Sequence, residues 1–354
     1  MIIVGMSGGV DSSVTASYLK SKGNEILGIT MKLIHDSNQK VSCNGKVYCG
    51  DKDTMDAVTV AQRMDFLHFT VNYENEFKKE VIDNFIESYK NCLTPNPCIK
   101  CNEKIKFDLL LKKGIELGGE YLATGHYARI DKKNGRYRLL KAKYLPKDQT
   151  YFLYKINQDQ LSRTLFPMGE YTKEEVRKMA LGFNLINANK SESMDICFVK
   201  NGTYKDFLKD NGVNFKNGII VNEEGEKIGE HCGIEFYTIG QKVGISDKNG
   251  SLYVKEINGN TIVASYNSGL FSKEIKIKNI NWISGEKPKN SFKADVKIRY
   301  SINIFKGTIF PDGRIILDER QRAITPGQSA VFYIEDECIG GGEILWQKMN
   351  NQKF

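Results

Sequence analysis

The sequence predicts an α/β chain in which a doubly wound parallel sheet is followed by two small mainly-β domains. Three observations support this fold class. Strand and helix signals alternate over the first 130 residues, short strands separated by turns fill the chain after about residue 200, and 354 residues suit about two or three domains. We expect the domains to span residues 1–200, 201–280 and 281–354.

The parallel sheet is predicted from apolar runs that are rich in β-branched residues. These runs indicate strands at residues 2–5, 26–33, 66–71 and 120–125. Between the last two runs, one apolar residue recurs at every fourth position and predicts a helix with a single apolar face, formed by Phe77, Val81, Phe85 and Tyr89. Because such sheets bind ligands at the carboxyl ends of their strands, the site is expected there.

After residue 200 the chain changes to short alternating strands, which are typical of all-β domains. Turn signals separate these strands at Glu224-Gly225, Asn258-Gly259 and Pro311-Asp312-Gly313. The polar stretch at residues 283–289 contains glycine and proline and indicates a boundary between two such domains.

Composition excludes several classes of protein. A hydrophobic content of 40% is enough for packed cores, and neither an apolar run of 18 residues nor a cleavable leader is apparent. We therefore expect a cytoplasmic protein that does not associate with membranes. With no export signal, the eight cysteines are expected to serve catalysis, metal binding or packing, and not a disulfide framework.

The net charge of +8 is concentrated in one strip, residues 129–147, which holds eight lysines and arginines and a single acid, Asp131. Two interpretations of this basic strip stay open. It is a solvated hairpin, or it binds a polyanion such as nucleic acid.

The run SGGVDSS, residues 7–13, follows the first strand and precedes a helix. Gly8 and Gly9 allow backbone amides to approach phosphate oxygens, while Ser7 and Ser12 add hydroxyl donors at a helix N-terminus. Asp11 stands where a kinase-type loop has lysine, which disfavours transfer of the γ-phosphoryl group. The loop suits attack at the α-phosphorus with pyrophosphate leaving; the alternative is a helix-capping turn without a ligand.

Two cysteines are predicted to lie in a loop, Cys98 and Cys101, just before a helix over residues 103–117. The helix N-terminus would lower the pKa of Cys101 and favour its thiolate. The spacing alone leaves zinc, a redox pair and an iron–sulfur site open. Cys197 by itself suits a core position. The other cysteines are interpreted as packing or incidental residues: Cys43, Cys49, Cys92, Cys232 and Cys338.

The phosphate loop resembles the SGGxDS signature of the PP-loop ATP pyrophosphatases, which adenylate an oxygen to make it a leaving group. Six further blocks follow it in order: PNPCIKCN, ATGHYAR, LPKDQTYFLY, SMDICFV, TIGQK and TPGQSAVFY. Together they resemble the tRNA-specific 2-thiouridylases, which replace the C2 oxygen of the wobble uridine (position 34) by sulfur. The resemblance spans the whole chain and implies an adenine nucleotide hydrolase-like first domain and a final β-barrel that contacts tRNA.

The resemblance implies that ATP, with Mg²⁺, is bound by Gly5, Met6, Ser7, Gly8, Gly9, Val10, Asp11, Ser12, Met31 and Gly125. It also implies that Cys197 carries a persulfide and that Cys101 is the partner nucleophile, the two closing a disulfide after transfer. The implied partners are tRNA, a persulfide donor such as a cysteine desulfurase or a sulfur relay protein, and a reductant for that disulfide.

The family contacts the target base through residues that match Asn96, Pro97 and Cys98, but it usually has aspartate at the last position. Either another group supplies the assistance that this acid gives to the reaction at the target base, or Cys98 takes part in the chemistry as a third thiol. The alternative cofactor is an iron–sulfur cluster on Cys98, Cys101 and Cys197 with one open iron site. The implied tRNA contacts are His126, Lys147, Asp148, Gln149, Arg299, Tyr300 and Gln328.

Two rival interpretations remain at the level of sequence. The first is another PP-loop adenylating enzyme, such as a tRNA cytidine thiolase or an amidotransferase-type synthetase, and those lack the β domain with TPGQ. The second is a scaffold protein without catalysis that binds RNA or an iron–sulfur cluster.

Overall fold

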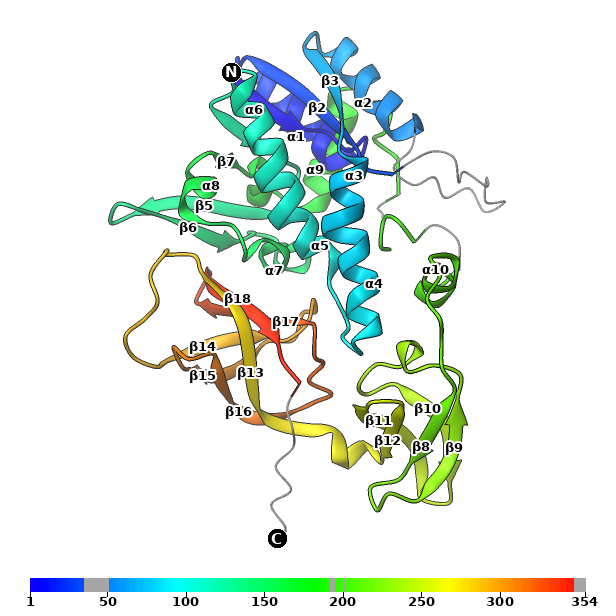
Figure 1. Cartoon of the computed structure of the whole chain (residues 1–354). Helices are drawn as coiled ribbons and strands as arrows, with labels where there is room; N and C mark the ends of the chain where they lie inside the picture. The colour runs from blue at the N-terminus through cyan, green and yellow to red at the C-terminus, as the bar shows by residue number, and fades with distance from the viewer. Residues whose placement is uncertain (35–50, 192–194, 200–201, 347–354) are drawn as a thin grey trace.

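The computed structural model describes residues 1–34, 51–191, 195–199 and 202–346. Figure 1 shows a parallel-sheet domain that contains the N-terminus, a small β domain, and a barrel that contacts the sheet domain. This arrangement confirms the predicted fold class. No helix in the described ranges is long and apolar enough to cross a membrane.

The first domain contains a parallel sheet of five strands in the order β3-β2-β1-β4-β7. The strands are β1 (Ile2–Gly5), β2 (Ile26–Lys32), β3 (Leu67–Asn72), β4 (Tyr121–Ala123) and β7 (Thr164–Leu165). Four of them lie where apolar runs predicted strands, and β7 is an addition. The order reverses between β1 and β4, so the carboxyl ends of these strands open the crevice in which such sheets bind ligands.

Helices cover both faces of this sheet. One face packs against α1 (Val10–Ser21), α2 (Asp51–Arg63) and α9 (Lys173–Gly182), through a core that includes Val4, Val14 and Val176. The other face packs against a long helix composed of α5 (Pro97–Lys100), a π-helical segment (Cys101–Leu110) and α6 (Leu111–Glu116). The short helices α7 (Thr150–Leu153) and α8 (Gln158–Ser162) join this second core.

The predicted stripe of every fourth residue is confirmed. It lies on a continuous helix of α3 (Glu74–Phe77), a π-helical segment (Lys78–Ile82) and α4 (Asp83–Lys90). All four side chains are buried in one cluster that also holds Phe198 and, from α10 (Tyr204–Asp210), Leu208. The wider π turn suits a spacing of four, which is longer than the α-helical repeat.

The last domain is a closed antiparallel barrel of six strands in the order β13-β16-β15-β14-β17-β18, because β13 pairs with both β16 and β18. The strands are β13 (Phe271–Trp282), β14 (Phe292–Lys297), β15 (Phe305–Ile309), β16 (Arg314–Arg322), β17 (Ser329–Ile334) and β18 (Glu337–Ile344). Since β13 begins at Phe271, it crosses the expected boundary between residues 280 and 281.

The middle domain is a five-stranded sheet in the order β10-β11-β12-β8-β9. Its strands are β8 (Gly218–Val221), β9 (Lys227–His231), β10 (Lys242–Asp247), β11 (Gly250–Asn258) and β12 (Thr261–Ser265). Alternate residues such as Leu252, Val254 and Ile262 form its apolar core.

A hairpin of the first domain completes the barrel sheet. Its strands are β5 (Ala128–Lys133) and β6 (Arg136–Lys141), and β6 pairs with β18 through Leu139 opposite Cys338 and Leu140 opposite Glu337. The hairpin of the first domain and the barrel therefore share one continuous sheet of eight strands.

Candidate active site

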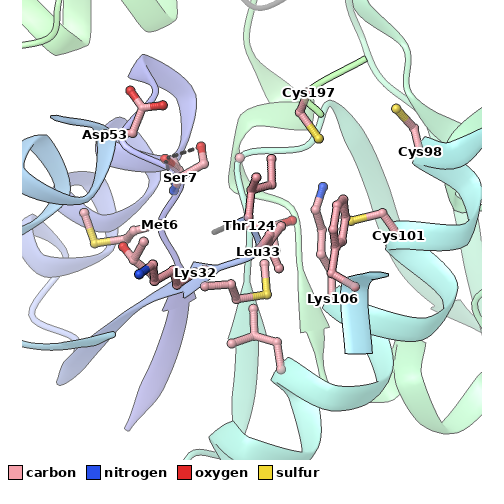
Figure 2. A pocket seen from close by; sticks show the side chains of 18 of the residues that line it. Met6, Ser7, Lys32, Leu33, Asp53, Cys98, Cys101, Lys106, Thr124 and Cys197 are labelled. Carbon is pink, nitrogen blue, oxygen red and sulfur yellow. Dashed lines mark hydrogen bonds between the residues drawn. The ribbon is translucent and has the colours of Figure 1, made fainter. Parts of the chain in front are cut away.

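One cavity of about 430 Å³ lies at the carboxyl ends of β1, β2 and β4, as the order of the strands predicts. Figure 2 shows the phosphate loop at one end of it and three cysteines at the other. The predicted residues that line it are Gly5, Met6, Ser7, Asp11, Ser12, Met31, Pro97, Cys98, Cys101, Gly125, His126, Gln149 and Cys197.

Hydrogen bonds of its own serines stabilise the conformation of the phosphate loop. The amide of Ser7 donates to Ser12 Oγ at 3.2 Å, and Ser12 Oγ donates to the carbonyl of Gly9 at 3.2 Å. Gly9 precedes α1 in an extended conformation, with no side chain capping the first amides of the helix. These amides and the positive end of the helix dipole are suited to a phosphate group. Val10 is buried under the loop and anchors α1 in the core.

Two glycines are required by close backbone approaches. Gly8 has a φ of +72°, and a Cβ atom there would meet the carbonyl oxygen of Asp53 at 2.2 Å. Gly125 follows β4, and a Cβ atom there would lie 2.7 Å from the amide nitrogen of Ser12. The end of β4 therefore rests directly on the phosphate loop.

Two lysines that sequence reasoning missed reach this loop from the far part of the domain. Lys173 donates to both carboxylate oxygens of Asp11, and the hydroxyl of Tyr127 donates to the same carboxylate at 2.8 Å. Lys190 donates to the carbonyl of Gly8 at 3.1 Å, and it pairs with Asp53 and Asp56 of α2. The loop has no lysine of its own, but Lys173 and Lys190 bring positive charge to it. No local sequence signal identifies these contacts.

The helix that carries Cys98 and Cys101 starts earlier than predicted, so the expectation of a loop followed by a helix at residue 103 is wrong. The helix begins at Pro97, with Asn96 as its N-cap and the Asn96 side chain accepting from the amide of Ile99 at 3.4 Å. Proline suits the first helical position, and asparagine is a preferred N-cap. Cys98 is therefore the thiol nearest the helix N-terminus, and Cys101 follows the first turn.

The cysteine end of the cavity brings together Cys98, Cys101 and Cys197 from two segments, with Lys106 beside them (Figure 2). Loss of hydration beside the cavity walls raises the pKa of the Cys98 thiol although its side chain keeps exposed surface, and the positive charge of Lys106 opposes this shift. Cys338 is buried in the barrel and Cys92 is half-buried beside the middle domain, which suits packing, whereas Cys232 is exposed. Cys43 and Cys49 lie outside the described residues.

The iron–sulfur alternative does not fit this arrangement. Within the described ranges, no three side chains of His, Cys, Asp or Glu lie together closely enough to hold a metal ion. The three cysteines share a cavity without forming such a set.

His126 is neutral in this site. Its Nδ1 lies 2.7 Å from Thr124 Oγ1, and its Nε2 lies 3.5 Å from the ammonium of Lys106. Burial, together with the charge of Lys106, holds the pKa of His126 well below the ordinary value of 6.5. The ring packs against Phe107 and Phe166, with ring centroids 5.8 and 5.9 Å away, and the two phenylalanines also contact each other, so the three rings form one cluster that restricts the orientation of the imidazole.

The other expected tRNA contacts differ in exposure. Asp148 is only 2% exposed, and its carboxylate accepts from Thr150 and pairs with Lys297, so a direct contact of this carboxylate with tRNA does not fit. Gln149 accepts from the amide of Tyr127 at 2.9 Å. The remaining residues are half-buried or exposed: Lys147, Arg299, Tyr300 and Gln328.

The basic strip is a hairpin that contacts the barrel, which neither interpretation of the sequence anticipated. Arg129 pairs with Asp336 at 3.0 Å, and Arg136 and Arg138 pair with Glu337 at 2.7 and 3.5 Å. Only part of the strip remains available to a polyanion, including the exposed Lys132 and Lys133.

Three family models match the chain. They are described as a tRNA methyl transferase HUP domain (residues 1–201), a tRNA methyl transferase PRC-barrel domain (residues 205–265) and an aminomethyltransferase beta-barrel domain (residues 272–344). The third match begins next to the first residue of β13.

Two relatives illustrate the similarity over the full length. A tRNA-specific 2-thiouridylase MnmA of Halothermothrix orenii is 42% identical over 352 residues, covering 97% of this chain and 98% of the relative. The MnmA of Clostridium perfringens is 40% identical over 351 residues, with the same coverage. A solved NMN synthetase of Francisella tularensis covers 54% of this chain and 66% of its own at 16% identity, but its TM-score of 0.34 is too low to support an argument. The chain, with its phosphate loop, cysteine cavity and closed barrel, therefore belongs to the MnmA family of tRNA-specific 2-thiouridylases.

Proposed function

We propose that this protein catalyses the ATP-dependent 2-thiolation of the wobble uridine (position 34) of tRNA. The observation that carries the proposal is that one cavity joins a phosphate loop to Cys101 and Cys197. Replacing oxygen by sulfur at an unreactive carbonyl needs both parts, because the oxygen must become a leaving group before a sulfur nucleophile displaces it.

In the first step, the loop binds the β and γ phosphates of ATP, and Met31 contacts the adenine. The C2 oxygen of uridine attacks the α-phosphorus, the bond from this phosphorus to the bridging oxygen breaks, and pyrophosphate leaves. The loop amides and hydroxyls stabilise the pyrophosphate by donating hydrogen bonds to it, and no proton is transferred.

Mg²⁺ is part of the proposal because Asp53 lines the cavity next to the loop, and its carboxylate, which pairs with Lys190, would hold the ion once that lysine moved to the phosphates. In nucleotide sites, this ion is held by one or two carboxylates together with the phosphates. Bound there, it would neutralise phosphate charge.

In the second step, the terminal sulfur of a persulfide on Cys197 attacks C2, and the C2–O bond breaks to release AMP. The thiolate of Cys101 then attacks Sγ of Cys197, which forms the Cys101–Cys197 disulfide and releases the thiocarbonyl product. The disulfide is two electrons more oxidised than the two free thiols, so a thiol reductant must reduce it before the next turnover. A cysteine desulfurase or a sulfur relay protein supplies the persulfide, and we place the reaction in the cytoplasm.

Target binding requires the uridine to leave the stack of a single-stranded anticodon loop. The cavity is suited to receive it at the end lined by Pro97 and Cys98, which Asn96 precedes as the N-cap of their helix. Tyr300 lies on the barrel and is 46% exposed, with its ring centroid 4.3 Å from that of Phe152, so it offers an aromatic surface on which a base of the tRNA would stack.

The deciding experiment measures products formed from ATP with and without tRNA. We expect AMP and pyrophosphate in equal amounts and only with tRNA, and none from Asp11→Ala. Cys197→Ser should lose both the persulfide, detected as added sulfur mass on its peptide, and all 2-thiouridine. Cys101→Ser should keep the persulfide and make no product. ADP as the product, or normal thiolation by Cys197→Ser, would overturn the proposal.

Methyl transfer to tRNA is the second candidate, because the descriptions of two matching family models carry the words methyl transferase. Nucleoside mass spectrometry of the treated tRNA separates the two reactions, since one exchanges oxygen for sulfur and the other adds a methyl group.

A further inference from the structure

Among the parts of the chain that the structure describes, Lys106 is the lysine of the cavity wall without a carboxylate partner. Among the described residues, two lysines line the cavity, Lys32 and Lys106. Lys32 pairs with Glu74 at 3.3 Å, whereas the side-chain contact of Lys106 is with the neutral ring of His126. A half-buried ammonium group without a counter-ion in a cavity is suited to an anionic ligand.

The contacts of His126 explain why Lys106 keeps its place. An ammonium group only donates hydrogen bonds, so His126 Nε2 is the acceptor and Nδ1 carries the proton that is donated to Thr124 Oγ1. The ring packs against two phenylalanines, and turning it would break its hydrogen bonds to both Thr124 and Lys106. Thr124 and His126 therefore hold the ammonium of Lys106 at a defined point of the cavity.

This point lies between the two chemical ends of the site. His126 follows Gly125, where an added Cβ atom would lie only 2.7 Å from the backbone of Asp11 and Ser12 in the phosphate loop. Lys106 itself lies one helical turn after Cys101 on the same helix and borders the cysteine end. A nucleotide with its β and γ phosphates in the loop and its α-phosphorus facing the thiols brings the α-phosphoryl oxygens toward Lys106.

We propose that Lys106 binds the α-phosphoryl group, in ATP during adenylation and in AMP as it leaves, with Thr124 and His126 as its positioning residues. The assignment rests on the proposed function. It also changes the role expected for His126, from a contact with tRNA to the acceptor that holds a catalytic lysine.

The charge of Lys106 serves both steps without a proton transfer. When the uridine oxygen attacks, negative charge builds up on the non-bridging oxygens of the α-phosphorus, and the ammonium stabilises it. When the C2–O bond breaks, the electron pair goes to the phosphate oxygen of AMP, and the same ammonium pairs with the dianion. Loss of this contact should lower the rate of thiolation about 10²–10³-fold, as for other donors to developing charge.

The test measures binding of AMP, adenosine and inorganic pyrophosphate by calorimetry to the full-length protein. Lys106→Met should weaken the binding of AMP about 10- to 100-fold, which is the loss typical of a charge-assisted contact. The affinities for adenosine and pyrophosphate should stay unchanged. Lys106→Arg should restore most of the AMP affinity. Lys104→Met is the matched control, because Lys104 lies on the same helix, pairs with Glu103 and does not line the cavity.

The positioning role of His126 has its own readout. His126→Gln keeps a side-chain acceptor for Lys106 and should retain AMP affinity, whereas His126→Phe keeps the bulk without an acceptor and should lose it. A protein that lost its structure would instead lose adenosine and AMP together.

Three results would overturn the assignment. They are an unchanged AMP affinity in Lys106→Met, an equal loss of adenosine and AMP affinity in a Lys106→Met protein whose circular dichroism stays native, and equal AMP affinities in the two His126 variants. If any of these results were found while the wild-type protein still bound ATP tightly, only the role of Lys106 would be overturned. The proposed function would be unaffected. A wild-type protein that bound neither ATP nor AMP would overturn both.

Discussion

Lys173 donates to both carboxylate oxygens of Asp11, at 2.7 and 2.9 Å, although 162 residues separate the two in the chain. Asp11 belongs to the wall of the cavity that we assign to phosphates. An aspartate in that place would repel a nucleotide unless its charge were balanced. The lysine therefore allows the loop to carry an acid and still accept a polyanion.

Lys173→Met should weaken ATP binding about tenfold, because the uncompensated carboxylate then faces the phosphates. The double variant Asp11→Asn/Lys173→Met removes both charges and should recover most of that loss. Calorimetric titration with ATP measures the affinity of the wild-type protein, of the single variants Asp11→Asn and Lys173→Met, and of the double variant. Additive losses would show that the two charges act independently.

Gly125→Ala should reduce ATP affinity, since its Cβ atom would lie 2.7 Å from Ser12 N and push the phosphate loop away from β4. The control is Gly182→Ala at the end of α9, where a Cβ atom meets nothing within 4 Å. That change should leave ATP binding unaltered and not destabilise the helix. Equal ATP affinities in the two variants would contradict the close contact of β4 with the loop.

Glu337→Gln should lower the free energy of unfolding by about 1–2 kcal/mol, because it removes the charge that Arg136 and Arg138 share at a half-buried junction. Urea denaturation followed by tryptophan fluorescence is a suitable measurement, since Trp282 lies on the barrel strand β13. Asp318→Asn is the control because its pair with Lys293 is exposed, so its effect should stay within a few tenths of a kcal/mol, about the size of other surface pairs. Equal effects would mean that the junction is not specially stabilised by charge.

His126 should titrate well below pH 6.5 in the folded protein. Between its folded pKa and 6.5, the unfolded chain binds a proton at this residue that the folded protein does not. Its contribution to stability is therefore complete above about pH 6.5 and is lost as the pH falls through this window. Nuclear magnetic resonance of labelled imidazoles measures the shift directly. Lys106→Met should raise the pKa only partway, since burial is the larger cause.

Cys98→Asp restores the acid that the family usually has at this position. If the thiol only replaces that acid, the variant should keep substantial thiolation activity, and anaerobic reconstitution of the wild-type protein should bind no iron. A wild-type protein that bound iron and needed it for activity, with Cys98→Asp weakening the bound iron, would instead favour the cluster, because a carboxylate oxygen is a harder ligand than a thiolate.

Local patterns in the sequence were sufficient for the fold class and the phosphate loop. Strand signals, the stripe that starts at Phe77 and the run around Gly8 each depend on neighbours within a few residues, so a linear reading finds them. The start of the helix at Pro97 was also visible in principle, because Asn96 followed by Pro97 is a strong helix-start signal. The cysteine spacing drew attention to metal and redox motifs instead.

Contacts between distant segments could not be predicted from one sequence. Lys173 and Lys190 reach the loop because α9 and the chain after it pack beside α1, and no local pattern records that packing. The basic strip was judged by its charge alone. Its partners are Asp336, just before β18, and Glu337, the first residue of β18, and this strand becomes its neighbour only in the folded barrel.

The pairing of β6 with β18 also has a consequence for the newly made chain. Roughly 200 residues separate these strands, so at ribosomal rates the hairpin waits on the order of 10–40 seconds for its partner. During that time its open edge could pair with the same edge of another nascent copy. Arg129 and Arg136 then lack their partners Asp336 and Glu337, whereas Arg138 keeps its pair with Asp131 of the same hairpin. Two such edges repel each other, so we expect the arginines that later close the domain junction to oppose aggregation of the growing polypeptide.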